Sequence, residues 1–226
     1  MPAPGRIGFR ILPSPPRLDA SLVGAFRGLA SSNVADAIGR FNFMDPGIQS
    51  RSGLPLCGLA VTVNPRPGDN LMVHKALQLA EPGDIVVVST NGNTTSAVFG
   101  ELMCRTAVAC RLGGIVVDGA IRDADSMTAL GFPAFSRTVT PGGGDKDGPG
   151  EINVPISCGG VAVHPGDIVI GDRDGIAVVP HADAADVLEL VRALIKNEER
   201  RVAEIQAGTV FKPDIDETLK KKGVNE

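Results

Sequence analysis

The chain has 226 residues, 43% of them hydrophobic, which is enough to bury one substantial core and is the usual size of a single domain. Its 26 acidic and 22 basic residues give a formal net charge of -4, which argues against a nucleic-acid partner. The chain lacks an apolar run of the roughly 18 residues needed to cross a bilayer, so we expect a cytoplasmic protein without a membrane partner.

The four cysteines, at positions 57, 104, 110 and 158, contain no C-x-x-C pair. With three histidines in the chain they form no zinc-binding signature, so we expect reduced thiols.

The first half of the chain predicts two helices followed by a β-α-β unit. After a proline-rich entry, residues 18–30 have helical spacing, and Ser31 to Asn33 supply capping residues for a second helix over 34–40. Residues 58–64 and 85–90 are rich in β-branched side chains and predict strands. The amphipathic stretch 69–80 between them predicts a helix.

The second half continues this alternation and then changes character. A polar loop over 91–99 precedes a helix of three to four turns that ends at the glycine pair beginning at Gly113. A strand over 115–119 and a helix up to Gly131 follow. From there to Pro180 glycines punctuate short β segments as in antiparallel hairpins, and we expect a separate β section. A long charged helix over about 182–207 closes the chain, and the whole pattern predicts an α/β protein.

The tripeptide Pro-Gly-Asp occurs three times, beginning at Pro67, Pro82 and Pro165. Proline fixes φ and glycine permits positive φ, so these are predicted to be tight turns rather than binding loops.

Candidate chemistry lies where the strand over 115–119 ends. Arg122 and Asp123 follow that strand closely, and ligands of open α/β sheets bind at the carboxyl ends of strands. Twenty residues separate Glu101 from Arg122, which allows one helix and one strand to return to the same edge. Glu101, Arg122 and Asp123 could therefore converge, although an adjacent Arg and Asp can also be a plain ion pair. The helix that begins near Glu101 has unpaired amides that can receive a carboxylate.

The block GELMCRTAVACRLGGIVVDGAIRD, followed by PISCGGVAVHPGDIVIGDRDGIAVVP, resembles the RraA-like family over roughly residues 29–180. This family includes 4-hydroxy-4-methyl-2-oxoglutarate and 4-carboxy-4-hydroxy-2-oxoadipate aldolases, which also decarboxylate oxaloacetate, and the regulator of ribonuclease activity. The resemblance implies a swivelling β/β/α domain over 1–226. Residues 1–17 would be an N-terminal extension, and residues 182–226 a C-terminal helix and tail.

The resemblance also implies roles for the motif residues. Asp123 would bind Mg²⁺ or Mn²⁺, and Glu101 would hold water on that ion. Arg122 would contact the pyruvyl oxygen and stabilise the enolate formed when a carbon–carbon bond breaks. Substrate would also be bound at Gly100 and at the amides of Leu102 and Met103. The upstream acid is Glu rather than the Asp of the best-characterised aldolases, and the extra methylene bears on which substrate is accepted.

Partners follow from the same resemblance. A small 2-oxo acid would be the substrate, and the protein would be a homotrimer or homohexamer with sites between subunits. Asp36, Glu198 and Glu199 could reach the site of an adjacent subunit, although all three also fit solvated helical acids. His74, His164 and His181 are interpreted as structural.

Two alternatives remain. The chain could be a protein-binding regulator without catalysis, like the family's inhibitor of ribonuclease E, but Asp123 is retained here and that regulator lacks it. A methyltransferase would need a glycine-rich turn after a first strand. The glycine cluster that begins at Pro141 follows no such strand.

Overall fold

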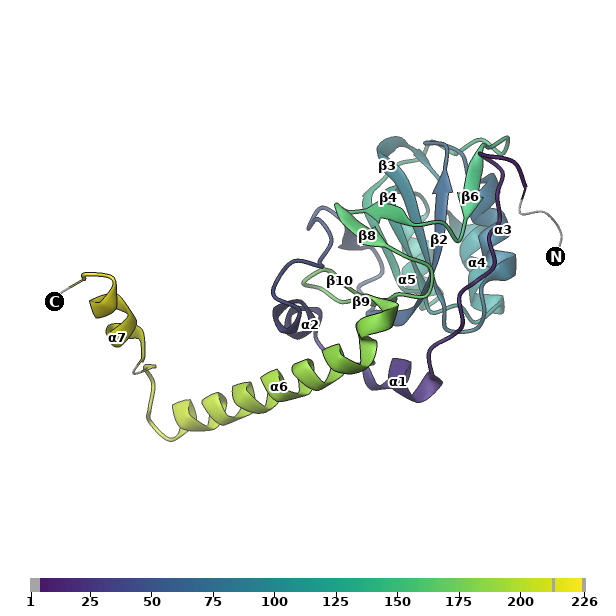
Figure 1. Ribbon diagram of the computed structural model, residues 1–226. Helices are drawn as coiled ribbons and strands as arrows, with labels where there is room; N and C mark the ends of the chain where they lie inside the picture. The colour runs from purple at the N-terminus through teal and green to yellow at the C-terminus, as the bar shows by residue number, and fades with distance from the viewer. Residues whose placement is uncertain (1–4, 213, 225–226) are drawn as a thin grey trace.

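The computed structural model describes residues 5–212 and 214–224, which form a mixed α/β body and a projecting C-terminal helix (Figure 1). The helices are α1 (Ala20–Ala25), α2 (Ser31–Ala37), α3 (Leu71–Leu79), α4 (Glu101–Ala109), α5 (Ala124–Ala129), a 3-10 turn (His181–Asp183), α6 (Ala184–Gln206) and α7 (Asp214–Lys221). The strands are β1 (Gln49–Ser50), β2 (Leu56–Pro65), β3 (Ile85–Ala97), β4 (Gly114–Ile121), β5 (Ala134–Val139), β6 (Gly150–Ile152), β7 (Ile156–Cys158), β8 (Val161–Val163), β9 (Ile168–Gly171) and β10 (Ile176–Val179).

The main sheet has the order β1-β5-β4-β3-β2-β9-β10, with β6 also paired to β2. Strands β2, β3, β4 and β5 run parallel, joined in turn by α3, α4 and α5. The β-α-β prediction is thus confirmed. Right-handed crossovers between neighbouring parallel strands put their helices on one face, where α3, α4 and α5 bury a core with Val88 and Val117 of the sheet.

The opposite face of the sheet carries the hairpin of β7 and β8, which packs on Val87 and Val116. Because both faces are covered there, the first part of β3 and most of β4 are apolar, as in residues 85–88 and 115–117. The hairpins β7–β8 and β9–β10 are antiparallel, as the glycine spacing predicts. The expectation of a separate β section is wrong, because β9 pairs with β2 and extends the main sheet.

Helices α1, α2 and the first half of α6 cover β9 and β10. The predicted capping role of Ser31 to Asn33 is wrong: α2 begins at Ser31, whose amide and hydroxyl donate to Asp172 over 2.8 and 2.7 Å. The first helix is also shorter than predicted, ending at Ala25 before Gly28 enters positive φ. The first difference arises from the contact with the distant residue Asp172, and the second from the left-handed backbone at Gly28.

Two further boundaries differ around the predicted site. Strand β3 continues through the predicted loop to Ala97, with register breaks after Ser89 and Asn93. Helix α4 ends at Ala109, before Gly113, because Arg111 adopts a left-handed conformation (φ 57°) and its carbonyl accepts the amide of Gly83.

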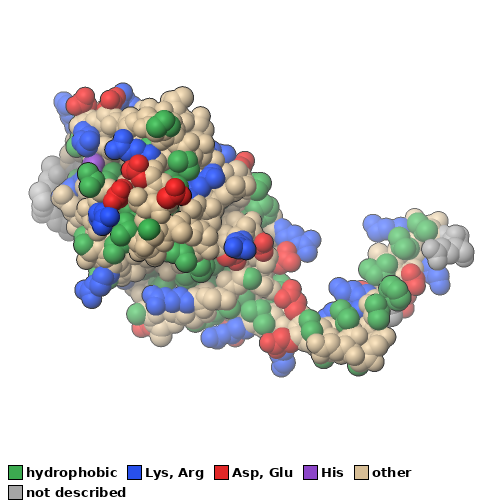
Figure 2. Space-filling view, turned by 180° about the vertical axis from the view of Figure 1, so that it is seen from behind, with side chains coloured by type: hydrophobic (Ala, Val, Ile, Leu, Met, Phe, Trp, Pro, Cys, Tyr) green, Lys and Arg blue, Asp and Glu red, His purple; other side chains and the backbone are tan. Residues whose placement is uncertain are grey.

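The long C-terminal helix matches its prediction within two residues and extends away from the body, with α7 at its far end (Figure 1). We call the part of α6 after Ile195, together with α7, the C-terminal arm. Hydrophobic side chains are exposed among charged ones along this arm, including Val202 and Ile205 (Figure 2). Over the described residues, no helix combines the length and apolar character needed to cross a bilayer.

Candidate functional site

A cleft of about 240 Å³ lies at the carboxyl edge of β3 and β4. It brings together all the residues that the sequence assigns to the motif: Gly100, Glu101, Leu102, Met103, Arg122 and Asp123. Strand β3 leads into α4 on one side, and Arg122 follows β4 on the other, with its amide donating to the Phe99 carbonyl over 2.9 Å. The spacing argument therefore places this cluster correctly.

Asp123 is held in an uncommon backbone conformation. Its φ of 57° and ψ of 42° are left-handed, a state that costs free energy for a residue with a side chain and that gathers at functional sites. Its Oδ2 accepts the Glu101 amide over 3.0 Å and lies 3.6 Å from Nε of Arg122. The Asp123 side chain is 41% exposed, so the carboxylate stands at the cleft surface rather than in a buried ion pair.

Gly100 is required by close approach rather than by its backbone angle, which is extended. A Cβ at this position would lie 2.8 Å from Oδ2 of Asp123 and 2.9 Å from Cγ of Arg122. Any larger residue would push the carboxylate and the guanidinium away from the start of α4.

The start of α4 presents amide donors to the cleft. The Glu101 amide is used by Asp123, and the first donor bonded inside the helix is Cys104, to the Gly100 carbonyl over 2.9 Å. The amides of Leu102 and Met103 lie between these two, in the part of a helix where N–H groups lack helical partners. With the positive end of the helix dipole they can receive a carboxylate.

Glu101 lies at the rim, where its carboxylate is already engaged. Its Oε1 lies 2.7 Å from Nη2 of Arg105, and its Oε2 accepts the Ser126 hydroxyl over 3.1 Å. Arg105 and then Ser126 lower the pKa of Glu101, which keeps it ionised and makes it a poor proton acceptor near neutral pH. The arrangement suits a hydrogen-bond acceptor better than a base.

Three residues of the opposite wall were not assigned to the site from the sequence: Asn70, His74 and Lys146. Asn70 is 7% exposed, and its Oδ1 is a buried oxygen without a hydrogen-bond partner among the described residues. Such an orphaned acceptor costs free energy unless a ligand or water fills it. Burial and then the nearby Lys146 charge lower the pKa of His74, which favours the neutral imidazole.

The sequence carries a weak signal for one of these three. Lys146 is a single cation inside the glycine-rich segment 142–148, part of the cluster that begins at Pro141 and lacks the pattern of a methyltransferase. Two of these glycines are needed for contact: a Cβ on Gly143 would lie 2.9 Å from Nη1 of Arg122, and one on Gly144 would lie 2.8 Å from the Gly68 carbonyl. The loop packs directly against the predicted site residues.

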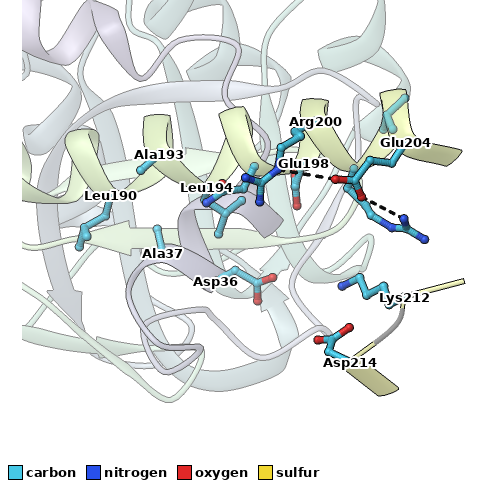
Figure 3. A pocket seen from close by; sticks show the side chains of 13 residues that line it. Asp36, Ala37, Leu190, Ala193, Leu194, Glu198, Arg200, Glu204, Lys212 and Asp214 are labelled. Carbon is cyan, nitrogen blue, oxygen red and sulfur yellow. Dashed lines mark hydrogen bonds and ion pairs between the residues drawn. The ribbon is translucent and has the colours of Figure 1, made fainter. Parts of the chain in front are cut away.

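Asp36 and Glu198 lie elsewhere, in a groove of about 900 Å³ between α2, α6 and the chain around Lys212 (Figure 3). Glu198 accepts a hydrogen bond from Nδ2 of Asn33 over 2.6 Å, and Asp36 pairs with Arg40 over 2.7 Å. Glu199 lies on the exposed side of α6. Within one chain, the structure does not bring these acids to Asp123.

The cleft fits a sparsely bound cation rather than a closed metal centre. Within 5–212 and 214–224, no group of three or more His, Cys, Asp and Glu side chains is arranged to hold a metal ion. Asp123 and Glu101 are the carboxylates that line the cleft. Mg²⁺ is commonly held by one or two carboxylates and keeps several waters, so this donor set fits it.

Comparison with known proteins identifies the family of the chain. The family model described as RraA-like, Aldolase/RraA, matches residues 31–178. A protein of Halalkalibacterium halodurans named "Putative 4-hydroxy-4-methyl-2-oxoglutarate aldolase" is 37% identical over 184 residues, covering 81% of this chain and 88% of that protein.

Solved structures have the same fold. An uncharacterized protein from Pseudomonas syringae pv. tomato superimposes with a TM-score of 0.78 at 28% identity, covering 85% of this chain and 92% of that one. The RNA-processing inhibitor RraA from Thermus thermophilis superimposes with a TM-score of 0.62 at 27% identity, covering 67% of this chain and 92% of that one.

Proposed function

The chain belongs to the RraA-like family, and we propose that it is a divalent-metal-dependent carbon–carbon lyase. It would release pyruvate from a 4-hydroxy-2-oxo dicarboxylic acid and would also decarboxylate oxaloacetate. One observation carries the proposal: a left-handed, half-exposed Asp123 stands beside Arg122 and the start of α4 at the carboxyl edge of the sheet. Left-handed backbone at a non-glycine residue gathers at functional sites, and here it sets an exposed carboxylate beside a guanidinium.

The residues of the cleft divide the substrate into two halves. The amides of Leu102 and Met103 receive the carboxylate next to the 2-oxo group. Arg122 donates to the 2-oxo oxygen, where negative charge accumulates as the bond between C3 and C4 breaks. Lys146 and Asn70, on the opposite wall, receive the polar groups of the departing fragment, and a charge-assisted bond from Lys146 suits its carboxylate.

Asp123 would hold Mg²⁺ or Mn²⁺ directly, and Glu101 would hold it through water. When bound, the ion supplies positive charge that stabilises the oxygen of the pyruvate enolate. His74, neutral because its pKa is lowered, can accept a hydrogen bond from the 4-hydroxyl group of the substrate.

We further propose that a second copy of the chain covers the C-terminal arm in a homotrimer or homohexamer. On α6, Leu188, Val191 and Ile195 follow a spacing of three and four residues and pack on the body of the same chain. Val202 lies seven residues after Ile195 and Ile205 three residues further, which puts both on the same side of the helix, at 53% and 45% exposure. A neighbouring subunit that buried them would bring the acids of the arm, Glu198 and Glu199, and Asp36 of α2 next to a partner.

The second candidate is a protein-binding regulator without catalysis. The similarity to an RNA-processing inhibitor favours it. The two functions differ in their need for Asp123, which a regulator could lose without effect.

The deciding experiment measures pyruvate release from oxaloacetate and from 4-hydroxy-4-methyl-2-oxoglutarate, with Mg²⁺ and with a chelator. We expect metal-dependent turnover of at least one substrate, and a loss of about a thousandfold or more in Asp123→Ala because the cation loses its ligand. Silence on both substrates with folded protein would favour the regulator. Full turnover by Asp123→Ala would instead contradict the role of Asp123 as the metal ligand.

A further inference from the structure

The three Pro-Gly-Asp turns look alike in sequence, and each ends in a buried aspartate. Asp69, Asp84 and Asp167 are 0%, 2% and 3% exposed. The Asp84 carboxylate accepts the amide of Glu81 over 2.8 Å, and the Asp167 carboxylate accepts the amide of His164 over 2.7 Å. These two carboxylates close their own turns by binding the residue three positions earlier. Asp84 also accepts the Arg17 guanidinium over 2.7 Å, and Asp167 also accepts the amide of His181 over 2.9 Å. Neither aspartate nor any of these partners lines the cleft.

The Asp69 carboxylate does not accept the amide of the corresponding residue, Arg66, because that amide donates to the Pro149 carbonyl over 2.8 Å. It contacts Arg66 through the guanidinium instead, with Nη2 of Arg66 3.3 Å from Oδ2 of Asp69. Oδ2 of Asp69 accepts the amides of Asp147 and Gly148, each over 2.8 Å. Oδ1 accepts the amide of Leu71, the first residue of α3, over 2.9 Å. This carboxylate thus joins the start of α3 to a loop 78 residues further along the chain.

Further bonds reinforce this junction, which we call the loop clasp and define as residues 66–70 with residues 145–148. The amide of Asn70 donates to the Asp145 carbonyl, and the amide of Asp145 donates to the Gly68 carbonyl, both over 2.8 Å. Nε of Arg66 donates to the Gly148 carbonyl over 2.9 Å. Both Lys146 and Asn70 belong to the loop clasp, and the residues on either side of Lys146 make its bonds.

We propose that Asp69 is a positioning residue for the cleft. Its carboxylate fixes the backbone directly after Lys146 and the start of α3, next to Asn70 and His74. The backbone before Lys146 is held by the bonds of Asp145 with Gly68 and Asn70. The groups facing the departing half of the substrate are therefore held at one separation from each other. This inference rests on the proposed function in assigning Lys146 and Asn70 to the substrate, but the clasp itself does not depend on it.

The negative charge of Asp69 matters for the loop clasp, because an ionised carboxylate accepts hydrogen bonds on both oxygens. Burial alone would raise the pKa of Asp69, but the amides of Leu71, Asp147 and Gly148 and the Arg66 guanidinium outweigh it and leave this pKa below its ordinary value. A carboxylate can accept on both oxygens, whereas an Asn side chain has one acceptor and one donor. The single acceptor oxygen of an Asn at position 69 can bind either the amide of Leu71 or the amides of Asp147 and Gly148, so Asp69→Asn frees one of these two segments.

The kinetic test compares Asp69→Asn with Asp167→Asn, a matched control in the same tripeptide away from the cleft. With 4-hydroxy-4-methyl-2-oxoglutarate we expect Asp69→Asn to raise KM about tenfold, with kcat changed less than about threefold, because ground-state contacts to the substrate are loosened. Both variants should lower the thermal midpoint by a similar amount, but Asp167→Asn should leave KM unchanged. Equal effects of the two variants on KM would overturn the proposal.

A double-mutant cycle with Lys146→Met tests whether Asp69 acts through this lysine. In the Lys146→Met background, Asp69→Asn should change KM less than about twofold, since coupled residues are not additive. An undiminished effect would mean that Asp69 does not act through Lys146. Should Asp69→Asn fail to fold, Arg66→Met, which removes an exposed donor of the clasp, should raise KM about threefold in the same direction.

Amide hydrogen exchange of the full chain gives a readout that needs no turnover. Asp69→Asn should speed exchange at 145–148 about tenfold or more, while the strands of the sheet exchange as in the natural protein. Unchanged exchange at 145–148 would overturn the clasp. Wild-type protein that releases no pyruvate would overturn the proposed function, and the exchange measurement would still decide the role of Asp69 in holding the loop.

Discussion

The two edges of the parallel strands β3 and β4 are both built on glycines that permit close contact, yet their surfaces differ in chemistry. At the amino edge, a Cβ on Gly113 would lie 2.6 Å from the Gly83 carbonyl. At the carboxyl edge, a Cβ on Gly100 would lie 2.8 Å from Oδ2 of Asp123. Gly113 thus allows two backbone segments to pack in direct contact, and Gly100 allows the backbone to pack against the charged side chains of Asp123 and Arg122.

The clefts at these edges differ in the same way. The amino-edge cleft, about 540 Å³, has mostly apolar and glycine walls, and its charged residues include Arg27 and Asp172. The smaller carboxyl-edge cleft, about 240 Å³, gathers Glu101, Arg122, Asp123, Lys146 and His74. The charged side chains therefore gather in the smaller cleft, at the ends of the parallel strands and the start of α4.

The largest difference between the edges should come from Gly100→Ala. The added methyl group displaces the Asp123 carboxylate and the Arg122 guanidinium, so we expect kcat/KM for oxaloacetate to fall about a hundredfold. The thermal midpoint should move little, because both displaced groups are partly exposed. Unchanged kcat/KM would mean that the close approach of Gly100 is not needed for turnover.

Gly113→Ala is the matched substitution at the amino edge. Its Cβ meets the Gly83 carbonyl and, at 2.9 Å, the buried Ile85 side chain, so we expect a loss of about 2 kcal/mol in the free energy of unfolding. Urea denaturation measures this loss. The kcat/KM of the folded fraction should equal that of the natural protein, and a selective loss of activity would contradict the division between the edges.

A smaller effect is expected from Lys146→Met, which removes the charge but keeps much of the side-chain length. KM for a 4-hydroxy-2-oxo dicarboxylic acid should rise about tenfold, the value of one charge-assisted contact. Exchange of the methyl protons of pyruvate with deuterium reports on enolate formation alone and should stay within about twofold. If the rate of deuterium exchange falls about as much as KM rises, Lys146 does not distinguish the two halves of the substrate.

The smallest effect should be that of Asp172→Asn at the amino edge, about 1 kcal/mol of stability at neutral pH, because Asp172 binds the start of α2. Burial would raise the pKa of Asp172, but bonds from Ser31 and then from the amides of Asp174 and Gly175 leave this pKa below its ordinary value. The ionised carboxylate therefore stabilises the fold above the unfolded pKa of about 3.9, and this is lost as pH falls through the lower folded pKa. Urea unfolding at pH 7 and at acid pH should show the two proteins converging, and a gap that widens in acid would contradict this sign.

Residue patterns predicted the part of the site that depends on local order. Apolar, β-branched residues predicted strands over 85–90 and 115–119, and the distance from Glu101 to Arg122 fits one helix and one strand. Connections of that length return to the same edge, so Glu101, Arg122 and Asp123 could be expected together. The resemblance to the RraA-like family added the roles proposed for them.

The opposite wall could not be predicted because its residues come from segments joined by contacts over long distances in the sequence. Lys146 reaches the cleft through Asp69, a residue that the repeated tripeptide marks only as a turn. The capping of α2 by Asp172 could not be predicted for the same reason, since Asp172 lies 141 positions after Ser31.

The sequence by itself determined the alternation of strands and helices and the edge at which the motif residues meet, because side-chain periodicity and the short reach of each connection act locally. Only the tertiary structure decided the left-handed backbone of Asp123, the unpaired oxygen of Asn70 and the turning of Asp69 toward a distant loop. Each of these features depends on which hydrogen-bond donors and acceptors still lack a partner after the chain has packed. That balance is set by burial and by contacts between segments rather than by the order of neighbouring residues.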